Sequence, residues 1–371
     1  MTIQMVDLVT QYKKLKPEID SAVAKVLESG QFILGKEVGE FESAASHYVG
    51  VKHAIGCASG TDALQIAVMA LGIKPGDEII TTPFTFFATA EAVALLGIIP
   101  VFVDIDEKTY NIRVDLIEPA ITSRTKAIMP VHLYGQPADL DEILEIARRH
   151  RLFVVEDNAQ ALGSLYHGKK AGSFGDFSCT SFFPSKNLGA YGDAGMIMTN
   201  NDTLESKARM IAQHGSRVRY KHELLGVNSR LDTMQAAILN VKLKYLDHWN
   251  TARQRNAAMY NKLLAAENVI KPFVAPERSH IYHQYSIRVS KRDALQEHLR
   301  TKGIPSAIHY PIPLHWQEAF QKIPGFVDRN KSFPVSEHIT KEIISLPMHP
   351  ELSEEQITFI AGAVTRFCEQ L

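Results

Sequence analysis

Cysteine and tryptophan are scarce in this chain of 371 residues, which has three cysteines and two tryptophans. Cys57, Cys179 and Cys368 are odd in number and far apart. A disulfide framework needs paired cysteines and a zinc site needs closely spaced ligands, so the sequence predicts neither. Reduced thiols are the simpler interpretation, and they indicate a reducing cytoplasm.

An excess of charge of one sign is also lacking. The chain carries 40 Lys and Arg against 41 Asp and Glu, a formal net charge of -1. Neither sign therefore provides a strong field that would attract nucleic acid or an anionic membrane. The 15 histidines are scattered and form no HExxH pattern, so no metal site is expected.

Long hydrophobic runs are missing as well. The most apolar stretch, residues 88–103, contains Glu91, Gly97 and Pro100, so no transmembrane span is expected. The N-terminal segment does not contain the apolar core of a secretory signal.

The chain does contain short β-branched runs that alternate with helical patterns. The expected strands are residues 53–57, 78–81, 100–103, 127–131, 153–156, 177–182 and 196–199. The expected helices between them are residues 61–71, 88–96, 140–150 and 204–214. This alternation predicts an α/β fold with a mostly parallel sheet covered by helices on both faces. Ligands of such sheets bind at the carboxyl ends of the strands.

A second, smaller region follows. A helical pattern over residues 228–265 predicts one long helix that connects two domains. Beyond it, a strand at 284–289 and helices at 292–302 and 354–369 indicate an α+β domain. We therefore expect a large domain over residues 1–250 and a small one over 251–371.

Two candidate ligand-binding segments lie at strand-to-helix junctions. Gly60 and Thr61 open a predicted helix, where free backbone N–H groups and the helix dipole favour a phosphate. The alternative is a plain helix cap made by Ser59 or Thr61. Residues 83–89 contain three phenylalanines, one of which can stack on a planar ring; the alternative is that they anchor the loop in the core.

Two carboxylates end the strand at 153–156. Burying Asp157 there is costly without a partner, and a protonated pyridine nitrogen, as in pyridoxal phosphate, is such a partner. Gln160, three residues on, is placed to reach the ring's phenolic oxygen. Capping of a short helix by Asp157 is the competing interpretation.

The segment 180–189 is the most specific. Lys186 stands alone among apolar and small residues after a strand, and burial would lower its pKa and make its amine a nucleophile. Ser181 in the same segment is a candidate phosphate ligand. A surface lysine is the alternative, and the Phe-Phe-Pro that precedes it argues against full exposure.

The last segment is Asn228 to Arg230. Asn228 is expected first as the cap of the long helix. Arg230 in a first helical turn opposes the helix dipole, which suggests an anionic ligand for it.

Taken together, these segments resemble the DegT/StrS family of sugar aminotransferases, within the fold-type-I pyridoxal-phosphate enzymes. The similarity extends from residues 30–35 through Ser59-Gly60-Thr61, 156–160 and 181–186 to 228–230. It implies a large domain with a mixed, mostly parallel sheet and a smaller C-terminal α+β domain.

The resemblance also implies roles for individual residues. Lys186 carries pyridoxal 5'-phosphate covalently, Asp157 pairs with the ring nitrogen and Gln160 contacts the ring hydroxyl. Phe86 stacks on the ring, while Gly60, Thr61 and Ser181 bind the phosphate. Asn228 reaches the phosphate of the neighbouring subunit, so the active sites of a homodimer are shared.

Within that family, four stretches resemble the branch that aminates the 3-keto group of UDP-2-acetamido-2-deoxy-3-oxo-glucuronate for bacterial lipopolysaccharide. They are residues 179–189, 226–239, 309–315 and 345–350. This likeness places Arg230, His309 and Tyr310 at the sugar, with L-glutamate as the amino donor. Arg230 suits a uronate carboxylate because its planar fork binds carboxylates with two hydrogen bonds. For His309 and Tyr310, a packed loop made rigid by prolines is an equal alternative.

Three other functions compete with this one. A 3- or 4-aminotransferase for dTDP- or UDP-linked keto-6-deoxy sugars shares every cofactor residue. A sugar 3-dehydratase of the same fold carries histidine at the lysine position, and Lys186 argues against it. A non-catalytic, pyridoxal-phosphate-binding regulator is the third.

Overall fold

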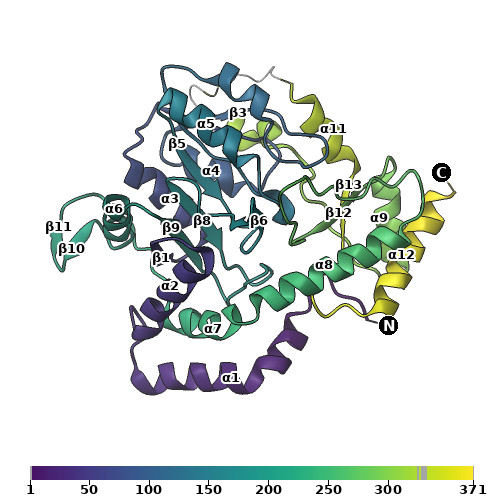
Figure 1. The fold of residues 1–371 in the computed structure, drawn as a ribbon, viewed down its shortest axis with the longest axis horizontal. Helices are drawn as coiled ribbons and strands as arrows, with labels where there is room; N and C mark the ends of the chain where they lie inside the picture. Colours follow the sequence, from purple (N-terminus) through teal and green to yellow (C-terminus); the bar gives the residue numbers. More distant parts are fainter. Residues whose placement is uncertain (1, 324–325, 327–331, 371) are drawn as a thin grey trace.

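The computed structural model describes residues 2–323, 326 and 332–370. Its centre is a seven-stranded sheet, and the expected α/β architecture is confirmed (Figure 1). The strands of the sheet, in chain order, are β1 (His53–Cys57), β2 (Glu78–Thr81), β3 (Ile99–Phe102), β4 (Thr125–Ile128), β5 (Phe153–Asp157), β8 (Phe177–Ser181) and β9 (Gly195–Thr199).

The sheet is mixed, with order β1-β9-β8-β5-β4-β2-β3. Strands β8, β5, β4, β2 and β3 are parallel to one another, whereas β9 pairs antiparallel with both β8 and β1. The carboxyl ends of the parallel strands therefore meet at one edge, as expected for a ligand site.

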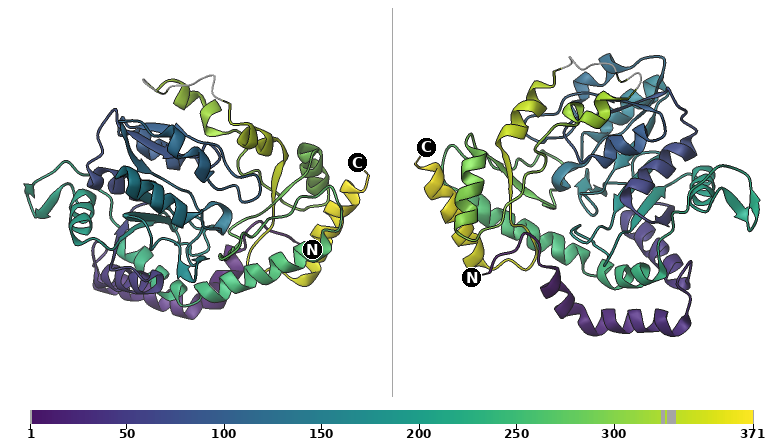
Figure 2. Two further views of the ribbon diagram at one scale, coloured as in Figure 1. Left: turned by 45° about the horizontal axis from the view of Figure 1, so that its top comes forward. Right: turned by 180° about the vertical axis from the view of Figure 1, so that it is seen from behind.

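Helices cover both faces of the sheet (Figures 1 and 2). The helices of the larger part are α1 (Leu8–Ser29), α2 (Lys36–Val49), α3 (Gly60–Leu71), α4 (Ala88–Ala94), α5 (Leu140–His150), α6 (Asp202–Ala212) and α7 (Thr233–Leu243). Helices α3, α4 and α6 pack on one face, and α2, α5 and α7 on the other. Neighbouring residues of β5 show the alternation: Val154 faces α5, and Val155 faces α3.

The smaller part is built on β12 (Tyr285–Arg288) and β13 (Ile343–Leu346), which pair antiparallel. Helices α8 (Leu246–Leu263), α9 (Arg292–Thr301) and α12 (Glu354–Cys368) pack around this pair, and Ile3 joins the same core. Short helices α10 (Glu318–Gln321) and α11 (Pro334–Glu342) lie between α9 and β13 in the chain. The division into 1–250 and 251–371 stays a prediction, since position 250 lies inside α8.

The single long helix expected over 228–265 is wrong. Residues 228–232 are extended, with bridges from Asn228 to Gln213 and from Asp232 to Ile33. Helix α7 begins only at Thr233, and a turn at Lys244 and Tyr245 separates it from α8. Asn228 is consequently not a helix cap, and Arg230 is not in a helical turn.

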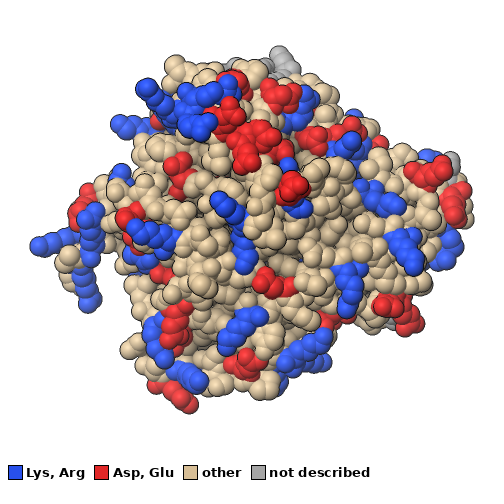
Figure 3. All heavy atoms as spheres, in the orientation of Figure 1, with Lys and Arg blue, Asp and Glu red and all other residues tan. Residues whose placement is uncertain are grey.

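Two short strands, β10 (Ser216–Val218) and β11 (Lys221–His222), form a hairpin that projects from the body of the molecule (Figure 1). Figure 3, in the orientation of Figure 1, shows charges of both signs interspersed over the surface, with Lys and Arg gathered on this hairpin.

A further small hairpin joins β6 (Leu165–Tyr166) and β7 (Lys169–Lys170). None of the helices in the described residues is both long and apolar enough to cross a membrane.

Candidate active site

A cavity of about 470 Å³ lies at the carboxyl edge of the sheet. Most of the residues expected at the site line it: Gly60, Thr61, Phe86, Asp157, Gln160, Ser181, Lys186, His309 and Tyr310. They come from the loops after β1, β2, β5 and β8 and from the segment before β13. Asn228 and Arg230 are not among the lining residues.

Lys186 lies on a tight loop that follows β8. The loop is closed at its ends by hydrogen bonds from Phe182 N to Ala194 O (2.8 Å) and from Ala190 N to Phe182 O (2.7 Å). Lys186 N itself donates to Phe183 O at 2.8 Å. Burial lowers the pKa of Lys186 to about 8, against the opposing attraction of Asp157. The amine is thus partly deprotonated near neutral pH.

Asp157, at the end of β5, faces Lys186 across the cavity. Its carboxylate accepts hydrogen bonds from Thr89 Oγ1 (2.7 Å) and Ala159 N (3.2 Å). Burial raises the pKa of Asp157, although these hydrogen bonds and the charge of Lys186 lower it. No ion pair in the described residues neutralises this carboxylate, so it is available to pair with a cation bound in the cavity.

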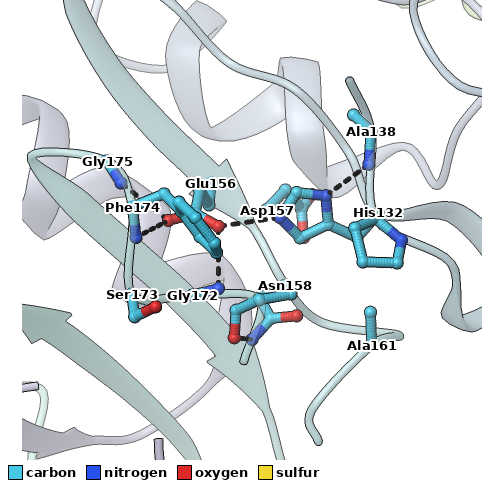
Figure 4. A network of polar contacts seen from close by, with 12 residues as sticks. His132, Ala138, Glu156, Asp157, Asn158, Ala161, Gly172, Ser173, Phe174 and Gly175 are labelled. Atoms are coloured by element: carbon cyan, nitrogen blue, oxygen red, sulfur yellow. Dashed lines mark hydrogen bonds and ion pairs between the residues drawn. The ribbon is translucent and has the colours of Figure 1, made fainter. Parts of the chain in front are cut away.

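Glu156, the neighbour of Asp157, points the other way and has a structural role (Figure 4). It accepts hydrogen bonds from the backbone N–H groups of Gly172 (2.7 Å), Phe174 (2.9 Å) and Gly175 (2.8 Å). His132 Nε2 lies 2.9 Å from the same carboxylate, and its Nδ1 accepts from Ala138 N. The Nδ1 acceptor leaves the ring proton on Nε2, which donates to Glu156.

The pKa values follow from this arrangement. Burial raises the pKa of Glu156, but the hydrogen bonds from His132, Gly175 and Gly172 outweigh it and lower the pKa. Glu156 therefore stays ionised and fully paired, whereas Asp157 is left for the cavity.

The N-terminus of α3 also lines the cavity, through Ser59, Gly60 and Thr61. Ser59 caps the helix by accepting from Asp62 N at 3.1 Å. Within the described residues, the backbone amides of Gly60 and Thr61 have no acceptor, as is usual for first-turn amides. A Cβ on Gly60 would lie 2.7 Å from Cβ of Ser181, so glycine is required for the helix end to approach β8. Two free amides and the Ser181 hydroxyl make a cradle for an anion.

Gly60→Ala is expected to weaken cofactor binding by roughly 10- to 100-fold, because overpacking costs about 1–3 kcal/mol and displaces Ser181 or the helix end. Titration of the apoenzyme with cofactor, followed by absorbance, measures the effect. Gly39→Ala in α2 is the control, since a Cβ there meets no atom within 4 Å. An unchanged dissociation constant in folded Gly60→Ala protein would contradict the cradle.

Gln160 links the part of the cavity near Asp157 to the part near Tyr310. Its Oε1 accepts from Tyr134 N (2.7 Å), and its Nε2 donates to the Tyr310 hydroxyl (2.9 Å). The Tyr310 ring lies 6.0 Å from the ring of Phe86. His309 Nδ1 is 2.9 Å from Ser345 Oγ, and burial together with the charge of Lys186 lowers the pKa of His309 to about 4.

His283 also lines the cavity, and the sequence did not single it out. Asn187 Nδ2 donates to Asn250 Oδ1 (2.7 Å) and Ile281 O (3.3 Å), which leaves Asn187 Oδ1 as an acceptor. His283 Nδ1, 3.3 Å away, must then carry the proton. Burial and the charge of Lys186 hold the pKa of His283 well below its usual value, so the ring is neutral. Its Nε2 therefore carries no proton and can accept a hydrogen bond.

Asn228 and Arg230 do not line the cavity, but they lie close to the N-terminus of α3 that does. Between them, the buried Ser229 donates to Asp62 Oδ2 (2.7 Å) and accepts from Ala58 N (3.0 Å). Side chains alternate along extended backbone, so Asn228 and Arg230 point away from this chain's own α3. Asn228 is exposed and Arg230 is half-buried.

These residues fit pyridoxal phosphate. The cradle of Gly60, Thr61 and Ser181 suits its phosphate, and the unpaired carboxyl of Asp157 suits its ring nitrogen. Lys186 supplies an amine of lowered pKa in the same cavity, and Phe86 supplies an exposed aromatic face. Gln160 has one amide proton left for the ring hydroxyl.

Comparisons with known proteins agree with this geometry. The DegT/DnrJ/EryC1/StrS aminotransferase family matches residues 13–365. The chain is 50% identical to a pleiotropic regulatory protein of Geobacillus stearothermophilus, over 99% of both chains. It is 48% identical to the UDP-2-acetamido-2-deoxy-3-oxo-D-glucuronate aminotransferase of Pseudomonas aeruginosa, over 98% of this chain and 99% of the other.

Among solved structures, DesV of S. venezuelae, in complex with a ketimine intermediate, has a TM-score of 0.96. Its sequence is 41% identical to this chain, and the match covers 100% of this chain and 99% of that one.

Proposed function

The chain belongs to the DegT/DnrJ/EryC1/StrS aminotransferase family, and from this we propose that it transfers the amino group of L-glutamate to a nucleotide-linked keto sugar. It is a pyridoxal-phosphate-dependent sugar aminotransferase. The proposed acceptor is the 3-keto group of UDP-2-acetamido-2-deoxy-3-oxo-glucuronate, which the 48% identical relative supports. We place the reaction in the assembly of bacterial lipopolysaccharide sugars, in a reducing cytoplasm where the three buried cysteines stay free.

One observation carries the proposal. An amine of lowered pKa, Lys186, and an unpaired carboxyl, Asp157, face one cavity whose far end is an open helix N-terminus. Transamination needs these three features together: a base, a counter-charge for the ring and an anchor for the phosphate. A sugar 3-dehydratase would carry histidine in place of Lys186.

When bound, pyridoxal phosphate supplies an electron sink for the carbon that loses its proton. The chain's own residues provide the rest. Lys186 Nζ would accept the proton that leaves the donor carbon and deliver it to the carbon that carried the cofactor's aldehyde. At a pKa of about 8, roughly a tenth of the amine is deprotonated at pH 7 and able to accept it. Asp157 keeps the ring nitrogen protonated through its negative charge, and Gly60, Thr61 and Ser181 hold the phosphate.

The sugar end requires a second subunit. Among the described residues that line the cavity, Lys186 is the only lysine or arginine, although glutamate and a nucleotide sugar are both anionic. Phe32, Ile33 and Leu34, which adjoin the start of α7, are 48%, 48% and 49% exposed. Exposed apolar residues in a row are typical of an interface. We propose a homodimer in which Arg230 binds the uronate carboxylate, and Asn228 the cofactor phosphate, of the other subunit's site.

Arg230→Ala is expected to raise KM for the sugar on the order of 100-fold, since removing one partner of a buried charge pair costs about 2–5 kcal/mol. Complementation tests the sharing. Lys186→Ala and Arg230→Ala homodimers, refolded together in equal amounts, form heterodimers with one intact site. At a sugar concentration well below KM, where both parents are nearly inactive, the mixture should recover about a quarter of wild-type activity. If the mixture stays as inactive as its parts, Arg230 acts within its own chain.

A substrate panel tests the acceptor. UDP- and dTDP-linked 3-keto and 4-keto sugars are offered with L-glutamate, and release of 2-oxoglutarate is measured. The proposal predicts the highest kcat/KM for the UDP-linked 3-keto uronate. Preference for a keto-6-deoxy sugar would instead indicate the alternative 3- or 4-aminotransferase.

A regulator that binds the cofactor without catalysis is the second candidate, favoured by the 50% identity to the pleiotropic regulatory protein of Geobacillus stearothermophilus. The complete set of Lys186, Asp157 and Gln160 in one cavity favours the enzyme. Glutamate converts the cofactor of an aminotransferase to its amine form in the absence of any sugar. A bound cofactor whose absorbance glutamate leaves unchanged would favour the regulator.

A further inference from the structure

Lys242 of α7 is buried without an acidic partner. Its side chain has no exposed area, and none of the described carboxylates forms an ion pair with it. Burial lowers its pKa to about 7. Burying an ammonium group lowers the free energy of unfolding, so stability does not explain why this position is a lysine.

Among the described residues, the one hydrogen bond of the Lys242 side chain leads to the loop that carries Lys186. Nζ donates to the carbonyl oxygen of Gly189. The rings of Tyr191 and Trp249 lie around the amine, with centroids 4.8 and 5.9 Å from Nζ. These π faces stabilise the charged form in place of water.

Gly189 transmits this contact to Lys186. A Cβ on Gly189 would lie 2.2 Å from the carbonyl oxygen of Pro184, so the loop folds back tightly on itself. Lys186 lies between these two residues in the chain. A displacement of the Gly189 carbonyl therefore also displaces the backbone of Lys186.

Helix α7 holds the same loop at a second point. Two turns before Lys242, Gln235 Oε1 accepts from Tyr191 N at 2.8 Å. From α8, Asn250 Oδ1 accepts from Asn187 at 2.7 Å. Lys242 thus completes a set of three side-chain contacts that fix the residues on the carboxyl side of Lys186.

We propose that Lys242 is a positioning residue for the reaction: its buried amine fixes the Gly189 carbonyl and thereby directs Lys186 into the cavity. It acts through Lys186 and touches neither cofactor nor substrate. The inference rests on the proposed function, because it assumes that Lys186 is the lysine that binds the cofactor.

Lys242→Met separates positioning from stability. Met has similar length and removes a buried charge, so the midpoint of unfolding should be unchanged or higher. The apoenzyme should combine with pyridoxal phosphate more slowly, with a shifted absorbance maximum of the bound cofactor. The value of kcat should fall on the order of 100-fold, with little change in KM, as expected for a misplaced catalytic group.

Lys170→Met is the matched control. Lys170 Nζ also donates to a backbone carbonyl, that of Tyr48 (2.8 Å), and lies 3.3 Å from the centroid of the Tyr48 ring. Among the described residues, these contacts of the amine do not involve the loop that carries Lys186. Lys170→Met should leave cofactor uptake and kcat unchanged. If Lys242→Met fails to fold, Lys242→Gln is measured in the same way, and its uncharged amide should retain folding with slowed cofactor uptake.

Each failure has its own signature. Wild-type uptake of cofactor at a lysine other than Lys186 would overturn the proposed function. Normal wild-type chemistry, with cofactor uptake and kcat of the folded Lys242 variant equal to wild type, would overturn the positioning role alone. So would a loss of activity that parallels a loss of folded protein.

Discussion

Lys186→Arg is expected to lower kcat on the order of 10⁴-fold or more, because both covalent attachment and proton transfer depend on a free amine. Burial lowers the pKa of Lys186 to about 8, so this lysine supplies that amine near neutral pH. Arginine preserves positive charge and much of the length, but its guanidinium stays protonated in proteins. The variant should therefore fold and fill the cavity without being able to react.

Single-turnover assays with glutamate alone measure the loss, and thermal unfolding checks that the variant is folded. Lys169→Arg, at an exposed position in β7, is the matched control and should behave as wild type. Turnover by folded Lys186→Arg protein within tenfold of wild type would remove Lys186 from the chemistry.

Asp157→Asn should lower kcat about 100- to 1,000-fold, a typical cost of losing one aligned electrostatic group. Asparagine has the same shape: its Oδ1 can still accept from Ala159 N, and its Nδ2 can donate to the Thr89 hydroxyl, so packing should survive. Without the negative charge, the ring nitrogen is no longer held protonated and the electron sink is weakened. KM for both substrates should change little.

The neighbouring carboxylate, Glu156, should behave differently from Asp157 when it is replaced by its amide. Glu156→Gln disturbs a fully paired side chain that does not line the cavity, so it should cost about 1–3 kcal/mol of folding free energy and leave kcat of the folded enzyme near normal. Denaturant titrations and kcat for both variants decide the matter. Equal losses of stability in the two variants, with equal kcat, would contradict the division of roles.

Much of the sheet could be predicted because its strands are short runs rich in β-branched residues that alternate with helical patterns. Strands β1 and β2 have the predicted bounds. The break between α7 and α8 could not be predicted, because the helical pattern of the sequence continues through Lys244 and Tyr245. Helix α7 packs on α2 and the sheet, whereas α8 leads to the smaller core, and only tertiary packing separates them.

The cofactor end of the site was predictable for a related reason. Gly60, Asp157 and Lys186 each follow a strand of one sheet, and strands of a shared direction bring such residues together. His283 could not be found in this way, because it precedes its strand and owes its place to contacts between α8 and the loop of Asn187. Lys242 looks like an ordinary helix lysine in the sequence; only its complete burial distinguishes it.

The central claim is that Lys186 binds pyridoxal phosphate. The most direct measurement is reduction of the holoenzyme with borohydride, followed by digestion and mass spectrometry of the labelled peptide. The structure predicts a single pyridoxyl group on Lys186. A label on Lys242, a fully buried lysine whose pKa is also lowered, or on any other lysine would contradict the account, as would the absence of a label from protein that retains its cofactor.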